Sequence, residues 1–140
     1  MIFGSKFTCT ANGRQFSIKG DISCNSSNVI YLMTCKNCSK QYVGSAKSFK
    51  ERFRVHKSDI NTGKVRCGIA KHFKDQCNTN GKFDNLQVQV IEHVQIDDHT
   101  DLESKLWMRE KYWQAQLFTL THGLNCEAEW FSTNRKGYRK

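Results

Sequence analysis

The sequence predicts an α+β domain built on a small, mostly antiparallel three-stranded sheet that is flanked by helices. Two short runs of β-branched and aromatic residues lie close together, separated only by a polar stretch, which is typical of a β-hairpin. A third run of this kind and further stretches with helical spacing of apolar residues follow. The predicted order of elements is therefore β-β-α-(α)-β-α.

The first two strands are expected at Val29–Thr34 and Gln41–Gly44, with Cys35–Lys40 as the loop between them. The third strand is expected at Leu86–Val94, where apolar residues recur at every second position. Together these segments are long enough for a sheet of modest size.

The helix after the second strand begins with a capping box, in which Ser48 and Glu51 satisfy the first helical amides. Its apolar face consists of Phe49, Phe53, His56 and Ile60. Gly63 is expected to end this helix, and a weaker helical pattern follows at Cys67–Gln76.

The last helix is predicted to run to about Leu120. Thr100 and Glu103 form a second capping box at its start, and Gly123 stands where glycine commonly follows a helix. Its apolar face consists of Leu102, Leu106, Trp113, Leu117 and Leu120.

Length and composition favour one globular domain, because the chain has 140 residues, of which 38% are hydrophobic and 11% aromatic. No run of 18 apolar residues predicts a membrane span, and the N-terminal residues lack the apolar core of a signal peptide. We expect an N-terminal extension at residues 1–28, the main domain at 29–126 and a basic tail at 127–140.

The charge distribution favours a polyanionic partner. The formal net charge is +9, yet residues 83–104 contain six acidic residues and no lysine or arginine. Cations concentrate between Lys36 and Lys74 and in the tail. This asymmetry predicts a face for nucleic acid and an acidic face in solvent, and the alternative is a generally basic soluble protein.

The seven cysteines are expected to be thiols or metal ligands, because no export signal accompanies them. Cys35 and Cys38 stand at the hairpin turn with the spacing of half a zinc site, and Cys9 and Cys24 would complete four thiolate ligands. Zinc would then pin the N-terminal extension, whereas the alternative is a set of reduced thiols. A second, weaker group of candidate ligands consists of Cys67, His72 and Cys77.

Glu110 interrupts the apolar face of the last helix. Its spacing from Leu106 and Trp113 points its side chain toward the core. Burying an unpaired carboxylate costs several kcal/mol, so a metal ion, an arginine or a lysine is expected beside it. The alternative is a structural ion pair with Arg109 or Lys111.

Arg52 and His56 on the first helix could likewise have a functional role or a purely structural one. Their i, i+4 spacing presents a guanidinium and an imidazole side by side, which suits a phosphate group. The alternative is a hydrogen-bonded core histidine with a surface arginine. Tyr31 and Tyr42 lie in the hairpin, where tyrosines are ordinarily packing residues.

Three segments, Tyr42–Arg52, Arg109–Trp113 and Gly123–Asn125, resemble in order and spacing the motifs of the GIY-YIG nuclease family. The resemblance spans about Val29–Cys126, most of the chain. Each motif alone is weak, but together they place six functional side chains in the family's order. The resemblance implies metal-dependent hydrolysis of DNA phosphodiesters, with one active site nicking one strand.

The catalytic residues implied by this resemblance are Tyr31, Tyr42, Arg52, His56, Glu110 and Asn125. Glu110 would bind Mg²⁺ or Mn²⁺, and Arg52 would hold the scissile phosphate. Tyr31 or His56 would be the general base, and the sequence does not decide between them. Tyr42 would orient water or phosphate, and the expected DNA-binding side chains are those of Lys47, Lys50, Arg54 and Lys57.

The hairpin with Cys35 and Cys38 is similar to that of the endonuclease domain of Penelope-like retroelements, although Val29 stands where the family name has glycine. This similarity implies target-site cleavage beside a reverse transcriptase domain of a longer parent protein. It implies a nuclear location in a eukaryote and a cytoplasmic one otherwise. Two alternatives stay open: a catalytically weak, zinc-organised DNA-binding module, and a structure-specific nuclease on branched DNA.

Overall fold

The computed structural model describes residues 6–18, 27–62, 72, 86–95 and 97–125. The described elements are β1 (Lys6–Thr8), β2 (Gln15–Ser17), β3 (Ser27–Cys35), β4 (Gln41–Ser48), α1 (Phe49–Thr62), β5 (Leu86–His93) and α3 (Leu102–Gln116). Among the described residues, no helix is both long and apolar enough to cross a membrane. The weaker helix predicted at Cys67–Gln76 lies outside the described residues, apart from His72.

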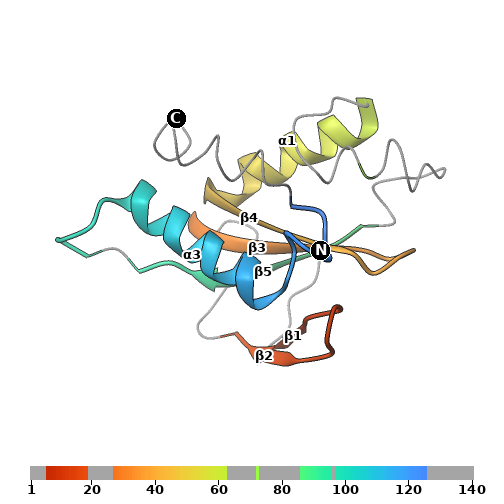
Figure 1. Ribbon diagram of the computed structural model, residues 1–140. Helices are drawn as coiled ribbons and strands as arrows, with labels where there is room; N and C mark the ends of the chain where they lie inside the picture. Colours follow the sequence, from red (N-terminus) through yellow and green to blue (C-terminus); the bar gives the residue numbers. More distant parts are fainter. Residues whose placement is uncertain (1–5, 19–26, 63–71, 73–85, 96, 126–140) are drawn as a thin grey trace.

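Strand β3 is the centre of a three-stranded antiparallel sheet with the order β4-β3-β5 (Figure 1). The predicted α+β fold is confirmed. Tyr31 of β3 lies opposite Gly44 of β4 and Val90 of β5, with a register shift between Ile30 and Tyr31. Because β3 pairs on both sides, its side chains are fixed on both faces of the sheet.

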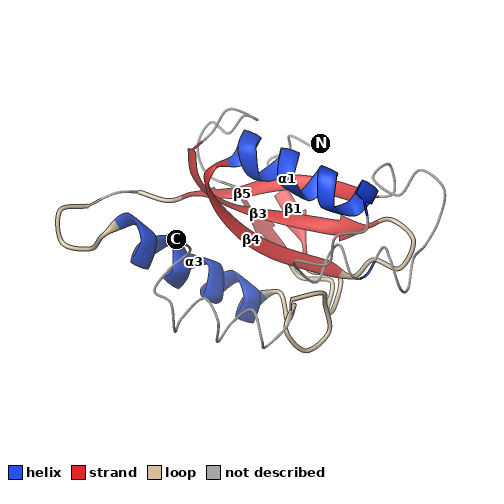
Figure 2. Cartoon of the chain, turned by 90° about the horizontal axis from the view of Figure 1, so that it is seen from above, coloured by secondary structure: helices blue, strands red, loops and turns tan. Residues whose placement is uncertain are grey.

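The two faces of the sheet bury different sets of residues, since strand side chains alternate between faces. Val29, Tyr31 and Met33 of β3 belong to a core cluster with Phe49 and Ile60 of α1. The intervening β3 residues belong to a second cluster with α3. Figures 1 and 2 show α1 and α3 packed against the sheet from different sides.

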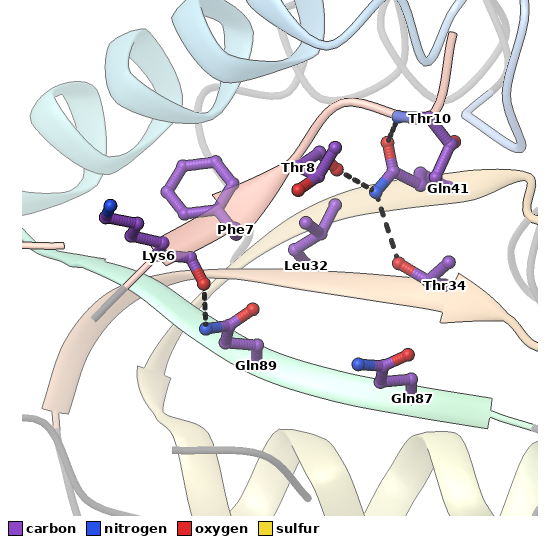
Figure 3. A pocket seen from close by; sticks show the side chains of 9 residues that line it. All are labelled: Lys6, Phe7, Thr8, Thr10, Leu32, Thr34, Gln41, Gln87 and Gln89. Carbon is purple, nitrogen blue, oxygen red and sulfur yellow. Dashed lines mark hydrogen bonds between the residues drawn. The ribbon is translucent and has the colours of Figure 1, made fainter. Parts of the chain in front are cut away.

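Strands β1 and β2 form a second, two-stranded sheet that the sequence analysis did not predict. Its Phe7 and Phe16 rings stack 5.3 Å apart, and both meet the Trp113 ring of α3 edge-on. Gln41 Nε2 donates to the Thr8 carbonyl at 2.8 Å beside a pocket between β1 and the sheet, lined by both polar and apolar side chains (Figure 3). Aromatic packing and hydrogen bonds from glutamine side chains to the backbone of β1 therefore hold this hairpin to the domain.

The start of α1 agrees with the predicted capping box, because the Glu51 amide donates to Ser48 Oγ at 3.3 Å. At the start of α3 the prediction was wrong by one residue. The capping side chain is Asp101, which accepts from the Ser104 amide, rather than Thr100.

The end of α3 also differs from the prediction, since the helix stops at Gln116 rather than near Leu120. Phe118 takes the left-handed conformation (φ 55°) that glycine usually supplies after a helix. Gly123 serves another purpose: a Cβ there would lie 2.5 Å from the Gln41 carbonyl oxygen. The chain turns off the helix early because the following segment packs against the edge of β4.

Candidate active site

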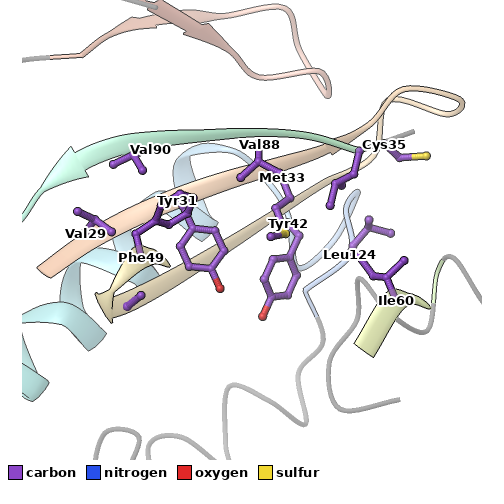
Figure 4. Close-up of a cluster of buried hydrophobic side chains, with 12 residues drawn as sticks. Val29, Tyr31, Met33, Cys35, Tyr42, Phe49, Ile60, Val88, Val90 and Leu124 are labelled. Atoms are coloured by element: carbon purple, nitrogen blue, oxygen red, sulfur yellow. The ribbon is translucent and has the colours of Figure 1, made fainter. Parts of the chain in front are cut away.

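Tyr31, Tyr42 and His56 form a compact buried group between the sheet and α1. Both tyrosine rings point to the same side of the sheet (Figure 4). Their ring centroids lie 5.6 and 5.8 Å from that of His56, which meets both rings edge-on. Tyr31 Oη and His56 Nε2 are 2.6 Å apart and share a hydrogen bond. A phenol and an imidazole thus lie within proton-transfer distance of each other.

Gly44 makes room for this arrangement. A Cβ at residue 44 would overlap the Tyr31 phenol, with Cε2 at 2.9 Å and the hydroxyl closer still. The Tyr31 ring therefore rests directly on the backbone of the neighbouring strand. The glycine in this motif serves close approach rather than a turn.

Arg52 lies one helical turn before His56 on α1 and is half-buried. Within the part of the chain that the structure describes, no carboxylate forms an ion pair with its guanidinium. A half-buried guanidinium one helical turn from an imidazole suits an anionic ligand. Phosphate binding by these two residues stays a prediction.

The predicted DNA-binding residues are all exposed. Lys50, Arg54 and Lys57 recur at helical spacing on the solvent side of α1. Arg54 forms an ion pair with Glu51, and their hydrogen bond holds the pKa of the Glu51 carboxyl below its usual value. Lys47 pairs with Glu103 of α3 at 2.6 Å. Exposed ion pairs of this kind are weak, so Lys47 and Arg54 can exchange their carboxylate partners for phosphates.

Glu110 projects from α3 and is 1% exposed, as its place on the apolar face predicted. Its Oε1 accepts a hydrogen bond from Ser45 Oγ at 2.8 Å, and its Oε2 accepts one from Lys111 Nζ at 3.0 Å. Ser45 directly follows Gly44 in β4, so the carboxylate and the Tyr31 phenol contact adjacent residues of one strand. The tyrosine group contacts the α1 side of that strand, and Glu110 contacts it from α3.

A buried carboxylate that needs a cation beside it fits a divalent metal ion, because Mg²⁺ in proteins often takes only one or two carboxylates. Glu110 supplies one such group, and Ser45 helps to orient it. The positive charge beside the carboxylate in this structure belongs to Lys111. The expected ion pair with Lys111 and the expected metal site therefore involve the same carboxylate.

The side chain of Asn125 forms hydrogen bonds with backbone groups of Val43. Its Oδ1 accepts from the Val43 amide at 2.8 Å, and its Nδ2 donates to the Val43 carbonyl at 3.0 Å. Gln114 Nε2 reaches the same carbonyl at 3.4 Å. This pairing holds the outer edge of β4 next to Gly44 and Ser45, so Asn125 acts by positioning the strand.

Cys35, Cys38 and His72 form a metal-ligand cluster, with their ligand atoms all within 4.8 Å of one another. Cys38 Sγ and His72 Nε2 are 3.3 Å apart. Tetrahedral zinc holds such ligand atoms about 3.5–3.8 Å apart at its usual bond lengths, so this donor set fits zinc. The third ligand beside the predicted pair Cys35 and Cys38 is thus His72, which belonged to the second, weaker group of candidate ligands.

Cys9 lies outside this cluster, which corrects its assignment as a ligand. Its Sγ donates to the Leu117 carbonyl oxygen at 3.6 Å, and its side chain is buried in the core beside Phe7 and α3. The β1–β2 hairpin places it there by packing aromatic rings on Trp113. The other predicted ligand, Cys24, lies outside the described residues, as do Cys67 and Cys77.

Comparison with known proteins identifies the family of this fold. The family model described as the GIY-YIG catalytic domain matches residues 27–139. The chain belongs to the GIY-YIG family. The catalytic domain of homing endonuclease I-TevI has a similar structure, at a TM-score of 0.52 and 26% identity over 69% of this chain and 95% of that one.

A mutant of the catalytic domain of intron endonuclease I-TevI is similar in fold, with a TM-score of 0.54 and 23% identity. That match covers 69% of this chain and 89% of the other. No curated protein matches the chain significantly. This GIY-YIG chain therefore carries a nuclease-type catalytic domain with the fold of a homing endonuclease domain.

Sequence reasoning missed two side chains that contact Glu110 or its surroundings. Ser45 gave a usable signal, because it alternates with Gly44 and so faces the α3 side of the sheet. Gln114 gave none, since its contact with Val43 depends on how α3 crosses β4. Lys111 was considered only as a structural partner.

Proposed function

We propose that this GIY-YIG domain is a divalent-metal-dependent DNA endonuclease that hydrolyses one phosphodiester bond and leaves a single-strand nick. The observation that carries the proposal is the buried hydrogen bond between Tyr31 and His56, 2.6 Å long. A structural tyrosine would not require an imidazole partner, since many acceptors satisfy a buried phenol. A general base does require one, because a tyrosine must lose its proton before it can accept another.

In the proposed reaction, the Tyr31 oxygen accepts a proton from the attacking water while its own proton passes to His56 Nε2. The 2.6 Å contact permits this transfer without rearrangement of either ring. Tyr42 meets the same imidazole edge-on and keeps it in place. The two transfers are linked: Tyr31 receives the proton of the water, and His56 receives the proton of Tyr31. The tyrosine and the histidine therefore act together as the base.

The half-buried Arg52 would bind the scissile phosphate through its guanidinium and neutralise the charge that develops there. Glu110 would hold the divalent ion, with Ser45 orienting its carboxylate. A bound Mg²⁺ or Mn²⁺ would stabilise the leaving oxygen and the charge on the phosphate. Asn125 keeps the strand edge between these groups in register.

The exposed face of α1 would carry the DNA backbone. Lys50, Arg54 and Lys57 lie on the same helix as Arg52, so phosphates bound there would lead toward the guanidinium. Each neutralised phosphate contributes about −0.9 to the slope of log K against log salt. Removing one of these cations should therefore reduce that slope by about 1.

We propose further that the chain acts in target-site cleavage of a retroelement, close to a reverse transcriptase domain in a longer parent protein. The support is the pair Cys35, at the end of β3, and Cys38, in the loop before β4. In a eukaryotic host this activity would take place in the nucleus. Sequence preference for the cut would be read by comparing nick positions on plasmids of different sequence.

The test is nicking of supercoiled plasmid in Mg²⁺ and in EDTA, with Tyr31→Phe and Glu110→Gln beside the wild type. Both variants should lose activity at least a hundredfold, and EDTA should abolish it. Matched controls are Tyr112→Phe, at an exposed position of α3, and Asp98→Asn, at an exposed carboxylate before that helix. Both controls should nick like the wild type.

A folded wild type that binds DNA in a salt-dependent way but nicks nothing would contradict the proposal. That result would favour a DNA-binding module whose basic face is α1. Nicking that requires a fork or a flap, and spares a plain duplex, would favour the structure-specific alternative instead.

We also propose that Cys35, Cys38 and His72 bind a structural zinc ion. The sulfur of Cys35 is buried and that of Cys38 exposed, and both approach an imidazole from a distant segment. Zinc would join the β3–β4 hairpin to the stretch between α1 and β5. The sequence offers Cys67 and Cys77, on either side of His72, as candidates for a fourth ligand.

The zinc content of the purified protein, measured by mass spectrometry, tests this site. One zinc per chain is expected, with loss in Cys38→Ser and in His72→Ala. Cys9→Ser is the matched control, since Cys9 lies in the core apart from the cluster, and it should keep its zinc. If Cys38→Ser and His72→Ala keep their zinc as the Cys9→Ser control does, the assignment of these ligands is wrong.

A further inference from the structure

The carboxylate of Glu110 already has an ionic partner. Lys111 Nζ donates to Oε2 at 3.0 Å, and Ser45 Oγ donates to Oε1 at 2.8 Å. Each oxygen is therefore engaged, one by a hydroxyl and one by an ammonium group. The carboxylate side chain is 2% exposed and the lysine side chain 8% exposed, so this ion pair is shielded from water.

The position of Lys111 requires an explanation of its own. Neighbouring residues on a helix point about 100° apart, so the ammonium reaches Glu110 only because the long side chain curls back. Lysine is among the residues that are least often buried. Its Nζ also lies 3.5 Å from Gln114 Oε1 and 6.0 Å from the centroid of the Trp107 ring. The groups around this ammonium thus form a defined polar site within α3.

Both cations cannot keep full contact with the same carboxylate. An ammonium group and a divalent ion on one carboxylate repel each other, and the repulsion is strong where water is excluded. Direct metal ligation at Oε2 therefore requires that the ammonium moves away. The long, flexible side chain of lysine allows this movement without unfolding of the helix.

We propose that Lys111 is a positioning residue that occupies the metal site before the metal arrives, and that a divalent cation binds by displacing its ammonium group from Glu110. This inference rests on the proposed function, in which Glu110 is the metal ligand. Lys111 holds the buried carboxylate in place in the metal-free protein. By competing for the carboxylate, it also raises the metal concentration at which the site fills.

The test is direct binding of Mn²⁺ alone, measured by the electron paramagnetic resonance signal of the unbound ion. Lys111→Met should bind Mn²⁺ at least fivefold more tightly than the wild type, because the competing charge is gone. Lys111→Gln, which keeps a hydrogen-bond donor without the charge, should do the same. Lys105→Met is the matched control: it removes a lysine of the same helix that pairs with Asp97, and its Mn²⁺ affinity should be unchanged.

The thermal stability of the metal-free proteins gives a second readout. Lys111→Met should lower Tm, because it removes the ammonium group that pairs with a buried carboxylate. Adding Glu110→Gln to Lys111→Met should restore most of that loss, since the uncompensated charge disappears. A double variant no more stable than Lys111→Met would overturn the counter-ion role.

The binding outcomes separate this inference from the proposed function. If Glu110→Gln abolishes Mn²⁺ binding while Lys111→Met binds no more tightly than the wild type, the displacement is wrong and the metal ligand stands. Weaker binding in Lys111→Met would also overturn the displacement, because the lysine would then support the metal. If Glu110→Gln binds Mn²⁺ like the wild type, both the metal ligand and the displacement are wrong.

Discussion

Replacing Gly44 with alanine is expected to disrupt the site at its centre. The added methyl would overlap the Tyr31 phenol, which is 1% exposed and packs against Phe49 at 5.6 Å between ring centroids. Overpacking of this kind costs about 1–3 kcal/mol. If the ring turns away from His56, the lost hydrogen bond adds about 0.5–1.5 kcal/mol.

The expected destabilisation from Gly44→Ala is therefore about 1.5–4.5 kcal/mol, summed from the overpacking and hydrogen-bond terms. Urea denaturation followed by tryptophan fluorescence measures it. With a slope of about 2 kcal/mol per molar urea, the midpoint should fall by about 1–2 M. Nicking should fall by about a hundredfold in native conditions, because a displacement near 1 Å is costly to catalysis.

Two further variants isolate the cause. Tyr31→Phe removes only the hydroxyl and should cost about 1 kcal/mol. Gly13→Ala adds a methyl at a glycine with φ 77° and no atom within 4 Å of the new Cβ, so it should cost only the backbone strain of about 1–2 kcal/mol. A Gly44→Ala protein with the wild-type urea midpoint would refute the close packing of Tyr31 on the backbone of β4.

Three other predictions concern the surroundings of the site. Asn125→Ala should cost about 1–3 kcal/mol because the buried Val43 amide loses its acceptor, while the Val43 carbonyl keeps Gln114 Nε2, and faster hydrogen exchange at the Val43 amide would show it. Phe7→Ala should cost about 3–4 kcal/mol by removing a buried ring from the hairpin, measured by urea denaturation; a change below 1 kcal/mol would mean that the hairpin does not pack on α3. Asp97 has its pKa lowered to about 2 by hydrogen bonds, chiefly from Lys105, so its contribution is present above about pH 4 and lost as pH falls through about 2. The stability difference between wild type and Asp97→Asn should accordingly shrink between pH 4 and pH 2, and a constant difference would contradict that linkage.

The features that could be predicted from the sequence are those with a local signal. The alternation in β5 predicted that strand, and the spacing of Phe49, His56 and Ile60 on α1 predicted both the helix and its buried face. The same reasoning predicted that Glu110 points inward, and the structure confirms this. These predictions succeeded because the side-chain periods of strands and helices follow from backbone geometry alone.

The features that were missed depend on contacts between distant segments. Strands β1 and β2 have only three residues each, too few for a visible alternation, and they form because Phe7 and Phe16 find the Trp113 ring. The metal-ligand cluster was half predicted, since the spacing of Cys35 and Cys38 is local. Tertiary structure brings His72 to these two cysteines, and it also places Cys9 in the core, away from the cluster.

The covering of the β4 edge has a consequence for association between chains. An exposed edge strand presents unpaired amides and carbonyls on which a strand from another chain can add. Here the Leu124 amide donates to the Gln41 carbonyl at 2.8 Å, and Asn125 takes both groups of Val43. Self-assembly by sheet extension is thus blocked over this part of β4 by the same segment that holds the strand in register. Loss of the segment with Leu124 and Asn125 would leave the amides and carbonyls of the β4 edge unpaired and would also disturb the site beside it. Aggregation and loss of activity should therefore arise together.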